Sequence, residues 1–225
     1  LGGVEPPKVL SVRTDGKGVK LFGLSFESEE PGLIYDSIGP VGADASVYLT
    51  FEQESMRASI EALAPDVVVL MVGGNDALAV RKAVRSLDEV RQQHVDLIET
   101  LKQHAPSAEC LVWAPMDAGE RYGKEIITKR YIEEIRDIQR ETAIELGCAF
   151  WDTFESMGGH GAFGRWLERG LMNQDMVHPR SKGGDLMGHL FVHALMNAYL
   201  GKDASETAES RDKSEGRQIR SPRGR

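Results

Sequence analysis

An aspartate and a histidine stand three residues apart in the segment Asn-Gln-Asp-Met-Val-His-Pro, directly before a segment that favours a helix. They are Asp175 and His178. Within one turn, this spacing lets the carboxylate accept a hydrogen bond from Nδ1 of the imidazole, which fixes the tautomer and leaves Nε2 as a base. The alternative is structural, because an aspartate and a histidine can also cap a helix and close a loop.

A second polar motif follows the continuous apolar run 67–72. The run ends in Gly73, Gly74, Asn75 and Asp76. Two glycines permit a sharp turn and a close approach of the backbone to a ligand, and the Asn75 amide offers N–H donors to a developing oxyanion. The alternative is an ordinary turn, since Gly, Asn and Asp are common turn formers.

A third segment, Leu-Ile-Tyr-Asp-Ser-Ile-Gly-Pro-Val-Gly-Ala, leads from a short β-prone run into a helix expected from Ala45. It contains Gly39 and Gly42. A glycine N–H in this loop can be a second oxyanion donor. In open α/β sheets, ligands bind outside the carboxyl ends of the strands, so residues that directly follow apolar strands are the first candidates for a site.

The elements that must position these residues alternate between apolar strands and helices. Strands are expected at 67–72, 109–114 and 148–151, and helices at 45–63, 86–101, 182–200 and from Ile127 to about Gly147. The first strand is apolar throughout, which suits burial on both faces. Ser86 and Glu89 form a capping-box pair at the start of the second helix. This alternation predicts an α/β fold with a mostly parallel sheet and helices on both faces.

Composition divides the chain into three parts. Residues 1–30 contain short β-prone runs separated by turn compositions, so we expect a β-rich segment there. Residues 31–201 contain the alternating strands and helices. Residues 202–225 have almost no apolar side chains and are expected to form a disordered tail.

Charge and hydropathy exclude several classes of partner. The 225 residues have a formal net charge of -8 and a pI near 5.3, without a basic stripe, so nucleic acid is not an expected partner. No apolar run approaches the roughly 20 residues that a membrane-spanning helix needs. The first residues are neither basic nor apolar enough for a signal peptide, and the chain begins with Leu1, so we expect a fragment or a processed product.

The two cysteines, Cys110 and Cys148, lie in apolar segments that are expected to be strands. Their spacing does not suggest a zinc or redox motif, and buried thiols are the preferred interpretation. If the two strands are neighbours in one sheet, the cysteines can instead pair, which would require an oxidising compartment.

Other polar residues receive structural interpretations. His94 lies on the apolar stripe of its helix and is expected to be a packed core residue. His189 and His193 are expected on the surface of the last helix, because no third ligand accompanies them as a metal site would require. His160 lies in a glycine-rich loop, and Asp152 either lies near the site or caps the next turn.

Taken in their order, these motifs resemble the SGNH (GDSL-like) hydrolase superfamily. Gly42 resembles the glycine block, Asn75 the asparagine block, and Asp175 with His178 the last block; the resemblance covers about residues 33–200. It implies a flavodoxin-like three-layer α/β/α fold and serine ester hydrolysis without a cofactor or metal. Asp175 and His178 would be the catalytic acid–base pair, and Gly42 and Asn75 would form the oxyanion hole.

The chain is similar in particular to peptidoglycan O-acetylesterases, in which a carbohydrate-binding-like β domain is inserted between the serine block and the glycine block. The phrases PGLIYDSIGPVGA, GCAFWD and MGGHGAF carry this similarity. It implies that residues 1–30 end the inserted domain and that the serine block lies upstream of Leu1. It also implies an acylated glycan of the cell envelope as substrate and a periplasmic or secreted location.

The nucleophilic serine is the departure from the family pattern, because the sequence contains no Gly-Asp-Ser block. Ser37, in Asp-Ser-Ile-Gly, imitates that block and precedes Asn75 and His178 in the right order. However, Tyr35 replaces the block's glycine, and the glycine block follows only a few residues later. Ser25 is less suitable because it lies inside an expected strand. The alternative function is therefore a non-catalytic glycan-binding or scaffold protein that keeps the pocket without the nucleophile.

Overall fold

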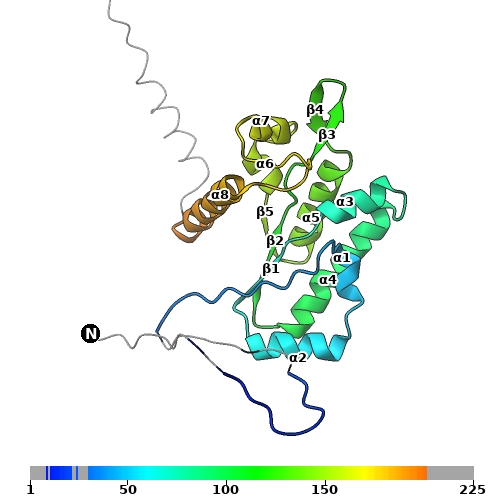
Figure 1. Cartoon of the computed structure of the whole chain (residues 1–225). Coiled ribbons are helices and arrows are strands. Elements are labelled where there is room, and N and C mark those ends of the chain that lie inside the picture. The colour runs from blue at the N-terminus through cyan, green and yellow to red at the C-terminus, as the bar shows by residue number, and fades with distance from the viewer. Residues whose placement is uncertain (1–8, 10, 22–23, 25–29, 202–225) are drawn as a thin grey trace, which may run out of the picture. The chain divides into compact units, whose positions relative to one another are not determined.

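A computed structural model describes residues 9, 11–21, 24 and 30–201 (Figure 1), and the contacts divide the chain into two units, Leu1–Gly39 and Pro40–Arg225. Within the first unit, the described residues form no helix or strand. The interpretation of residues 1–30 as part of a β domain therefore stays a prediction. The expected tail, 202–225, lies outside the described residues.

The described helices and strands all belong to the second unit. In chain order they are α1 (Ala45–Leu49), α2 (Gln53–Leu63), β1 (Val67–Leu70), α3 (Gly74–Arg81), α4 (Leu87–His104), β2 (Glu109–Trp113), β3 (Gly119–Tyr122), β4 (Glu125–Thr128), α5 (Ile132–Glu145), β5 (Ala149–Trp151), α6 (Thr153–Met157), α7 (Ala162–Glu168) and α8 (Ser181–Tyr199). None of these helices is long and apolar enough to cross a bilayer.

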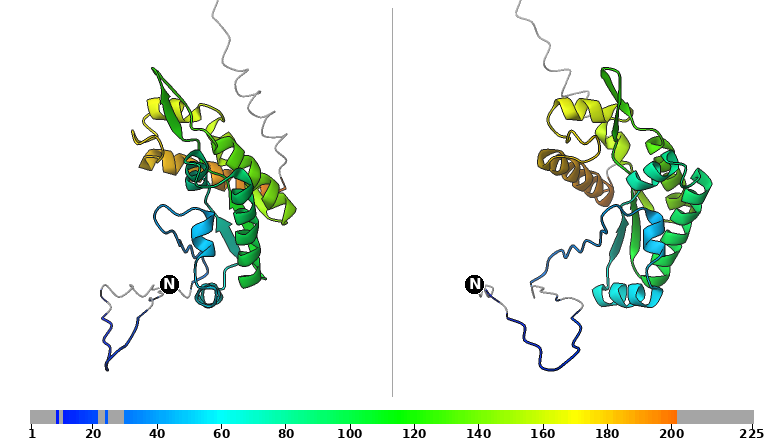
Figure 2. Two further views of the ribbon diagram at one scale, coloured as in Figure 1. Left: turned by 90° about the vertical axis from the view of Figure 1, so that its right-hand side faces the viewer. Right: turned by 45° about the vertical axis from the view of Figure 1, so that its right-hand side comes forward.

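The central sheet is parallel and has the strand order β1-β2-β5. Figure 2 shows α4 and α5 on one side of the sheet and α8 on the other. On the first side, Leu70 and Val112 pack with residues of both helices. On the second side, the ring of Phe191 from α8 lies 4.4 Å from the ring of Trp113. The expected α/β architecture, with helices on both faces of a parallel sheet, is confirmed.

The two cysteines are joined in a disulfide, so the expectation of buried free thiols is wrong. The register of the sheet explains the pairing. Leu111 of β2 is paired with Ala149 of β5, so the preceding residues, Cys110 and Cys148, lie opposite each other with their Cα atoms 4.9 Å apart. This distance lies within the range that a disulfide requires.

An antiparallel hairpin, β3–β4, replaces the start of the helix that was expected from Ile127 to about Gly147. Ile127 lies in β4, and Tyr131 precedes α5 with a left-handed backbone at φ 74°. Gly123 lies at the hairpin tip with φ 61°, a conformation that glycine adopts without strain. The apolar residues from Ile127 onward match a helical spacing, but they belong partly to strand β4 and partly to helix α5. The helix expected over 45–63 is likewise divided into α1 and α2.

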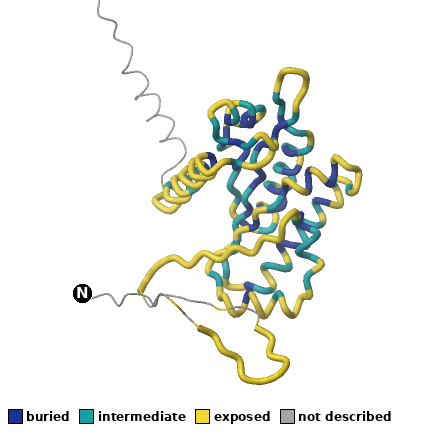
Figure 3. The backbone as a smooth tube through the Cα atoms, viewed as in Figure 1, coloured by how far each residue is buried: buried dark blue, intermediate teal, exposed yellow. Residues whose placement is uncertain are grey.

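The outer face of β1 is less covered than its apolar sequence predicted. Val67 is 52% exposed and Val69 is 44% exposed, whereas Leu70 on the opposite face is buried. In Figure 3 much of α8 is also exposed. Its exposed apolar side chains are Leu186, Val192, Leu195, Met196 and Tyr199. The expectation that β1 is buried on both faces is therefore wrong for the described part of the chain.

The packing of α8 against the preceding loop depends on a glycine. A Cβ atom added to Gly183 would overlap the carbonyl oxygen of Leu171, which is backbone and cannot move aside cheaply. The same oxygen accepts a hydrogen bond from the N–H of Arg180 at 2.8 Å. A side chain at this position would therefore push α8 away from the loop that contains Asp175 and His178.

We expect Gly183→Ala to lower the free energy of unfolding by about 1–3 kcal/mol, the usual cost of overpacking. The neighbouring Gly184→Ala is the control, because nothing lies within 4 Å of its added Cβ. A glycine-to-alanine change in a helix interior is expected to stabilise by about 0.5–1 kcal/mol. Urea denaturation of both variants measures the difference, and equal stabilities would contradict the close packing.

Candidate active site

Asp175 and His178 are hydrogen-bonded within a single turn. Nδ1 of His178 lies 3.0 Å from Oδ2 of Asp175, and the other carboxylate oxygen accepts the backbone N–H groups of Val177 and His178, each at 2.9 Å. The hydrogen bond from the His178 N–H, followed by the one from Val177, lowers the pKa of the Asp175 carboxyl from 3.8 to about 2. The carboxylate therefore stabilises this turn fully above pH 3.8, and this contribution is lost as the pH falls toward 2.

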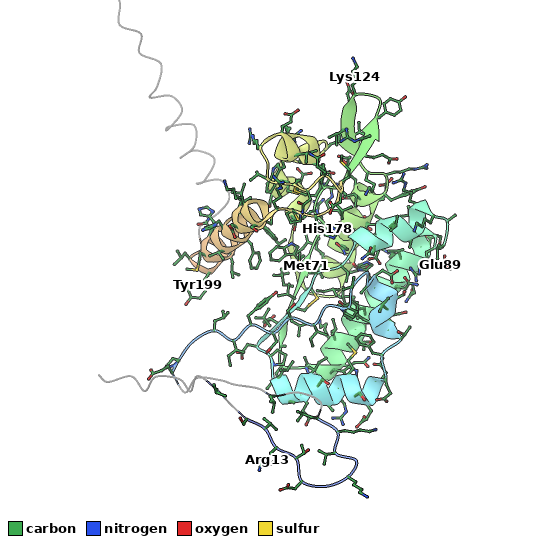
Figure 4. All side chains as sticks on the ribbon, viewed as in Figure 1. Arg13, Met71, Glu89, Lys124, His178 and Tyr199 are labelled. Atoms are coloured by element: carbon green, nitrogen blue, oxygen red, sulfur yellow. A yellow bond between two sulfur atoms is a disulfide. The ribbon has the colours of Figure 1, made fainter. Side chains whose placement is uncertain are left out.

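The loop around this pair is held on both sides. The N–H of Asn173 donates to the carbonyl of His178 at 2.8 Å, and the Asn173 side-chain amide donates to the carbonyl of Pro179 at 3.2 Å. The N–H of Gly119, at the base of the β3–β4 hairpin, donates to the carbonyl of Met176 at 2.9 Å. Figure 4 labels His178 in this loop. Its side chain is 73% exposed, so Nε2 is accessible from solvent.

The end of β1 is fixed by close packing around Gly73. This residue has φ 125°, and an added Cβ would lie 3.0 Å from the side-chain nitrogen of Gln139 and 3.1 Å from Pro115. Gln139 is buried and donates to the carbonyl of Val72 at 3.0 Å. These contacts explain why a glycine follows the strand. Beyond it, Gly74 starts α3, so the motif opens a helix instead of forming the ordinary turn of the alternative interpretation.

The structure brings Asn75 together with the segment that contains Gly42. Nδ2 of Asn75 donates to the carbonyl oxygen of Ala43 at 2.9 Å. Gly42 adopts φ 76°, which favours glycine at this position. Because an amide nitrogen carries two hydrogens, the second N–H of Asn75 can donate to a bound ligand. The Asn75 amide and the Gly42 loop thus form one unit beside the end of β1.

The other polar residues considered in the sequence cap a helix or lie on the surface. Asp152 is the N-cap of α6, accepts the N–H of Glu155 at 2.9 Å, and pairs with Arg140. His189 and His193 are exposed on α8, as expected for surface residues. His160 is exposed, with its Nδ1 3.4 Å from a carboxylate oxygen of Glu133.

Ser37 belongs to the first unit, Leu1–Gly39, and its role as a nucleophile stays a prediction. Ser25 lies outside the described residues.

Sequence reasoning gave no role to two carboxylates that the structure buries beside these loops. Asp76 is fully buried at the start of α3 and faces His94, whose expected burial in the core is confirmed. Asp117 follows β2, accepts the N–H of Phe163 at 2.7 Å, and has a pKa raised by its burial. A carboxylate a few residues after an apolar strand is the signal that could have identified both.

Lys129 is another residue without a predicted role. Partial burial, and then the nearby Arg81, lower the pKa of its ammonium group, while Glu120 and Asp175 act in the opposite direction. Its charge therefore interacts with that of the Asp175 turn.

Solved structures with a similar fold include several esterases. A peptidoglycan O-acetylesterase superimposes with a TM-score of 0.62 and 22% identity, over 70% of this chain and 44% of that one. An acetyl xylan esterase gives a TM-score of 0.53 and 20% identity, over 70% of this chain and 78% of that one. An acetylxylan esterase from Geobacillus stearothermophilus, a catalytic mutant, gives 0.51 and 18%, over 68% and 67% of the two chains.

This chain thus spans less than half the length of the peptidoglycan O-acetylesterase that it resembles. No curated protein matches it in sequence. The model of the GDSL-like lipase/acylhydrolase family matches residues 41–186, a range that includes Gly42, Asn75, Asp175 and His178. This match covers more than half of the chain, and the chain therefore belongs to the GDSL-like lipase/acylhydrolase family.

Proposed function

We propose that this chain carries the acid–base pair and the oxyanion hole of a serine ester hydrolase that removes O-acetyl groups from a cell-envelope glycan. The observation that carries the proposal is the Asp175–His178 hydrogen bond of 3.0 Å, which leaves Nε2 of His178 exposed as a base. Membership of an acylhydrolase family supports the same chemistry.

In the proposed reaction, Nε2 of His178 accepts the proton of a serine hydroxyl while the serine oxygen attacks the acyl carbonyl carbon. The carbonyl oxygen becomes an oxyanion, which the N–H of Gly42 and the free N–H of Asn75 stabilise. The imidazolium then gives its proton to the leaving alcohol oxygen, and the ester bond breaks. Water hydrolyses the acyl-enzyme by the same route. Asp175 holds Nδ1–H and stabilises the imidazolium.

The acetylated glycan is proposed from similarity and from the disulfide. The similar structures are named as a peptidoglycan O-acetylesterase and as acetylxylan esterases, proteins that deacetylate carbohydrate polymers. The Cys110–Cys148 disulfide supports an oxidising location, because such bonds persist mainly in periplasmic and secreted proteins.

The nucleophile is proposed to come from a further parallel strand beside β1. In the described part of the chain, β1 lies at a lateral edge of the sheet, although its sequence from Val67 to Val72 is the continuous apolar run of an interior strand. Val67 and Val69 are about half exposed there. A strand paired along the free side of β1 would end beside the loop of Asn75, because the carboxyl ends of parallel strands lie at the same end of the sheet. A serine at its carboxyl end is the proposed source of the hydroxyl.

The second candidate is a glycan-binding protein that keeps the pocket but does not hydrolyse esters. One observation favours it: the sequence lacks a Gly-Asp-Ser block. Ester hydrolysis by the full-length gene product distinguishes the two candidates. A full-length protein that binds acetylated glycan but leaves its acetyl groups intact would support the binding function.

The tautomer of His178 tests the acid–base pair without requiring a nucleophile. We expect neutral His178 to carry its proton on Nδ1, because the Asp175 carboxylate accepts it. Nitrogen-15 NMR of the imidazole identifies the protonated nitrogen. In Asp175→Ala, Nε2–H should become the major form. A wild-type His178 that is mainly protonated on Nε2 would show that the hydrogen bond is not maintained in solution.

Hydrolysis of p-nitrophenyl acetate by the full-length gene product tests the two roles separately. Asn75→Ala should lower kcat by about 10²- to 10³-fold, the usual loss for one oxyanion donor. His178→Ala should lower it by about 10²- to 10⁴-fold, because the general base is removed. His189→Ala is the matched control on exposed α8 and should keep full activity. Unchanged turnover in either site variant would contradict its assigned role.

Ser37 is tested in the present chain. We expect this chain and its Ser37→Ala variant to hydrolyse p-nitrophenyl acetate no faster than His178→Ala, because the proposed nucleophile is a serine of a further strand and not Ser37. Activity in the unmodified chain that disappears in both variants would instead identify Ser37 as the nucleophile.

A further inference from the structure

Two hydrogen bonds join the Gly42 segment to the first turn of α3. Nδ2 of Asn75 donates to the carbonyl oxygen of Ala43 at 2.9 Å, and Oδ1 of Asp76 accepts the N–H of Ala45 at 3.2 Å. The segments that they join are far apart in the sequence and carry the two proposed oxyanion donors. The first bond is made by Asn75, which is one of the proposed oxyanion donors. The second is made by Asp76, which does not contact the substrate in the proposed reaction.

Asp76 and His94 form a buried polar pair behind this junction. Both side chains have 0% exposure, and Nε2 of His94 lies 3.4 Å from Oδ1 of Asp76. Oδ2 of Asp76 and both ring nitrogens of His94 lack hydrogen-bond partners in the described part of the chain. Burying polar atoms in this way costs free energy, and apolar side chains of similar size would fill the same space more cheaply. If this pair only filled space, apolar side chains would stabilise the fold more.

The surroundings explain how this pair can control position. Asp76 lies in the first turn of α3, His94 lies in the middle of α4, and Ala45 is the fully buried first residue of α1. The pair therefore lies where three helices meet. The first N–H groups of a helix have no acceptor within the helix, so Asp76 supplies to Ala45 an acceptor that α1 itself cannot provide.

A separate set of contacts holds the N-terminal end of α1. Asp44 caps α1 by accepting the N–H of Ser46 at 3.1 Å. Arg85 binds the Asp44 carboxylate at 2.5 Å and the Ser46 hydroxyl at 2.6 Å. These contacts connect α1 to the residues before α4 and not to α3. Of the two bonds that fix the Gly42 segment to α3, the one made by Asp76 is the one that a substrate does not reach.

We propose that Asp76, supported by His94, is a positioning residue that sets the spacing between the Gly42 N–H and the Asn75 amide. This inference rests on the proposed function of these two groups as an oxyanion hole. Without the acceptor on Asp76, the segment before α1 can move relative to α3, and the two donors no longer converge on one oxygen. Because oxyanion donors act mainly on the transition state, the loss should appear in kcat while KM stays nearly unchanged.

Amide hydrogen exchange in the present chain tests the bond directly. Ala45 and Gln53 are each the first residue of a helix, α1 and α2, but Gln53 is exposed. The Ala45 N–H should exchange much more slowly than the Gln53 N–H, because Asp76 accepts it. Similar fast exchange at both positions in the unmodified protein would overturn the proposal, even before any variant is made.

Two substitutions of Asp76 separate the acceptor from the volume of the side chain. Asp76→Asn keeps an oxygen acceptor for Ala45 and should keep its slow exchange. Asp76→Leu keeps a similar size without an acceptor and should speed exchange at residues 43–46. Thr142→Val is the control, because Thr142 is also fully buried but bonds within α5 to the carbonyl of Ile138. If Thr142→Val speeds exchange at residues 43–46 as much as Asp76→Leu does, Asp76 has only a structural role.

Kinetics in the full-length gene product complete the test. Asp76→Leu should lower kcat for p-nitrophenyl acetate by about 10²-fold, comparable to losing one oxyanion donor, with little change in KM. Asp76→Asn should stay within a few-fold of the unmodified enzyme, and Thr142→Val should keep its kcat. Hydrolysis that is unaffected by Asp76→Leu would overturn the positioning role. If the exchange pattern is as expected but the unmodified full-length protein does not hydrolyse esters, the junction stands and the proposed function fails.

Discussion

The parallel pairing of β2 with both of its neighbours determines where the polar loops of this chain begin. Since β1, β2 and β5 run in the same direction, the residues that follow them all lie at one end of the sheet, the end where the strands finish. Asn75 follows β1, and the loop after β2 contacts the turn of Asp175 through Gly119 and Met176. The same register places Cys110 opposite Cys148, so the disulfide joins the two strands at the other end of the sheet.

Buried polar side chains hold several backbone segments at this end of the sheet. Gln139 holds the end of β1, Asp76 holds the start of α1, and Asp117 holds the start of α7 through the N–H of Phe163. Each of these side chains also keeps one oxygen without a hydrogen-bond partner in the described residues. Such groups stabilise a fold less than apolar side chains would. Their concentration beside the loops of Asn75 and Asp175 indicates that this end of the sheet is shaped for geometry as well as for stability.

The sequence predicted those parts of the fold that depend on local signals. The capping box at Ser86 and the three apolar strands appear where periodicity and capping placed them, and so does the last helix. The β3–β4 hairpin was missed because Ile127 and Tyr131 happen to match the spacing of the helix that follows. The Asp175–His178 hydrogen bond was predictable because both residues lie in one turn. The Asp76–His94 pair was not, because its members are joined only by the packing of α3 on α4.

The incomplete burial of β1 connects the fold to the chemistry. An apolar strand at a sheet edge offers unpaired backbone groups together with hydrophobic side chains, a combination that favours the addition of another strand. Val67 and Val69 on β1, and Val192 and Leu195 on α8, are exposed apolar side chains in the described part of the chain. A strand paired to β1 would satisfy its backbone groups, and side chains of that strand would lie beside Val67 and Val69 on the same face of the sheet. In the proposed function such a strand ends beside Asn75, so a segment paired to β1 would also be well placed to deliver the nucleophile.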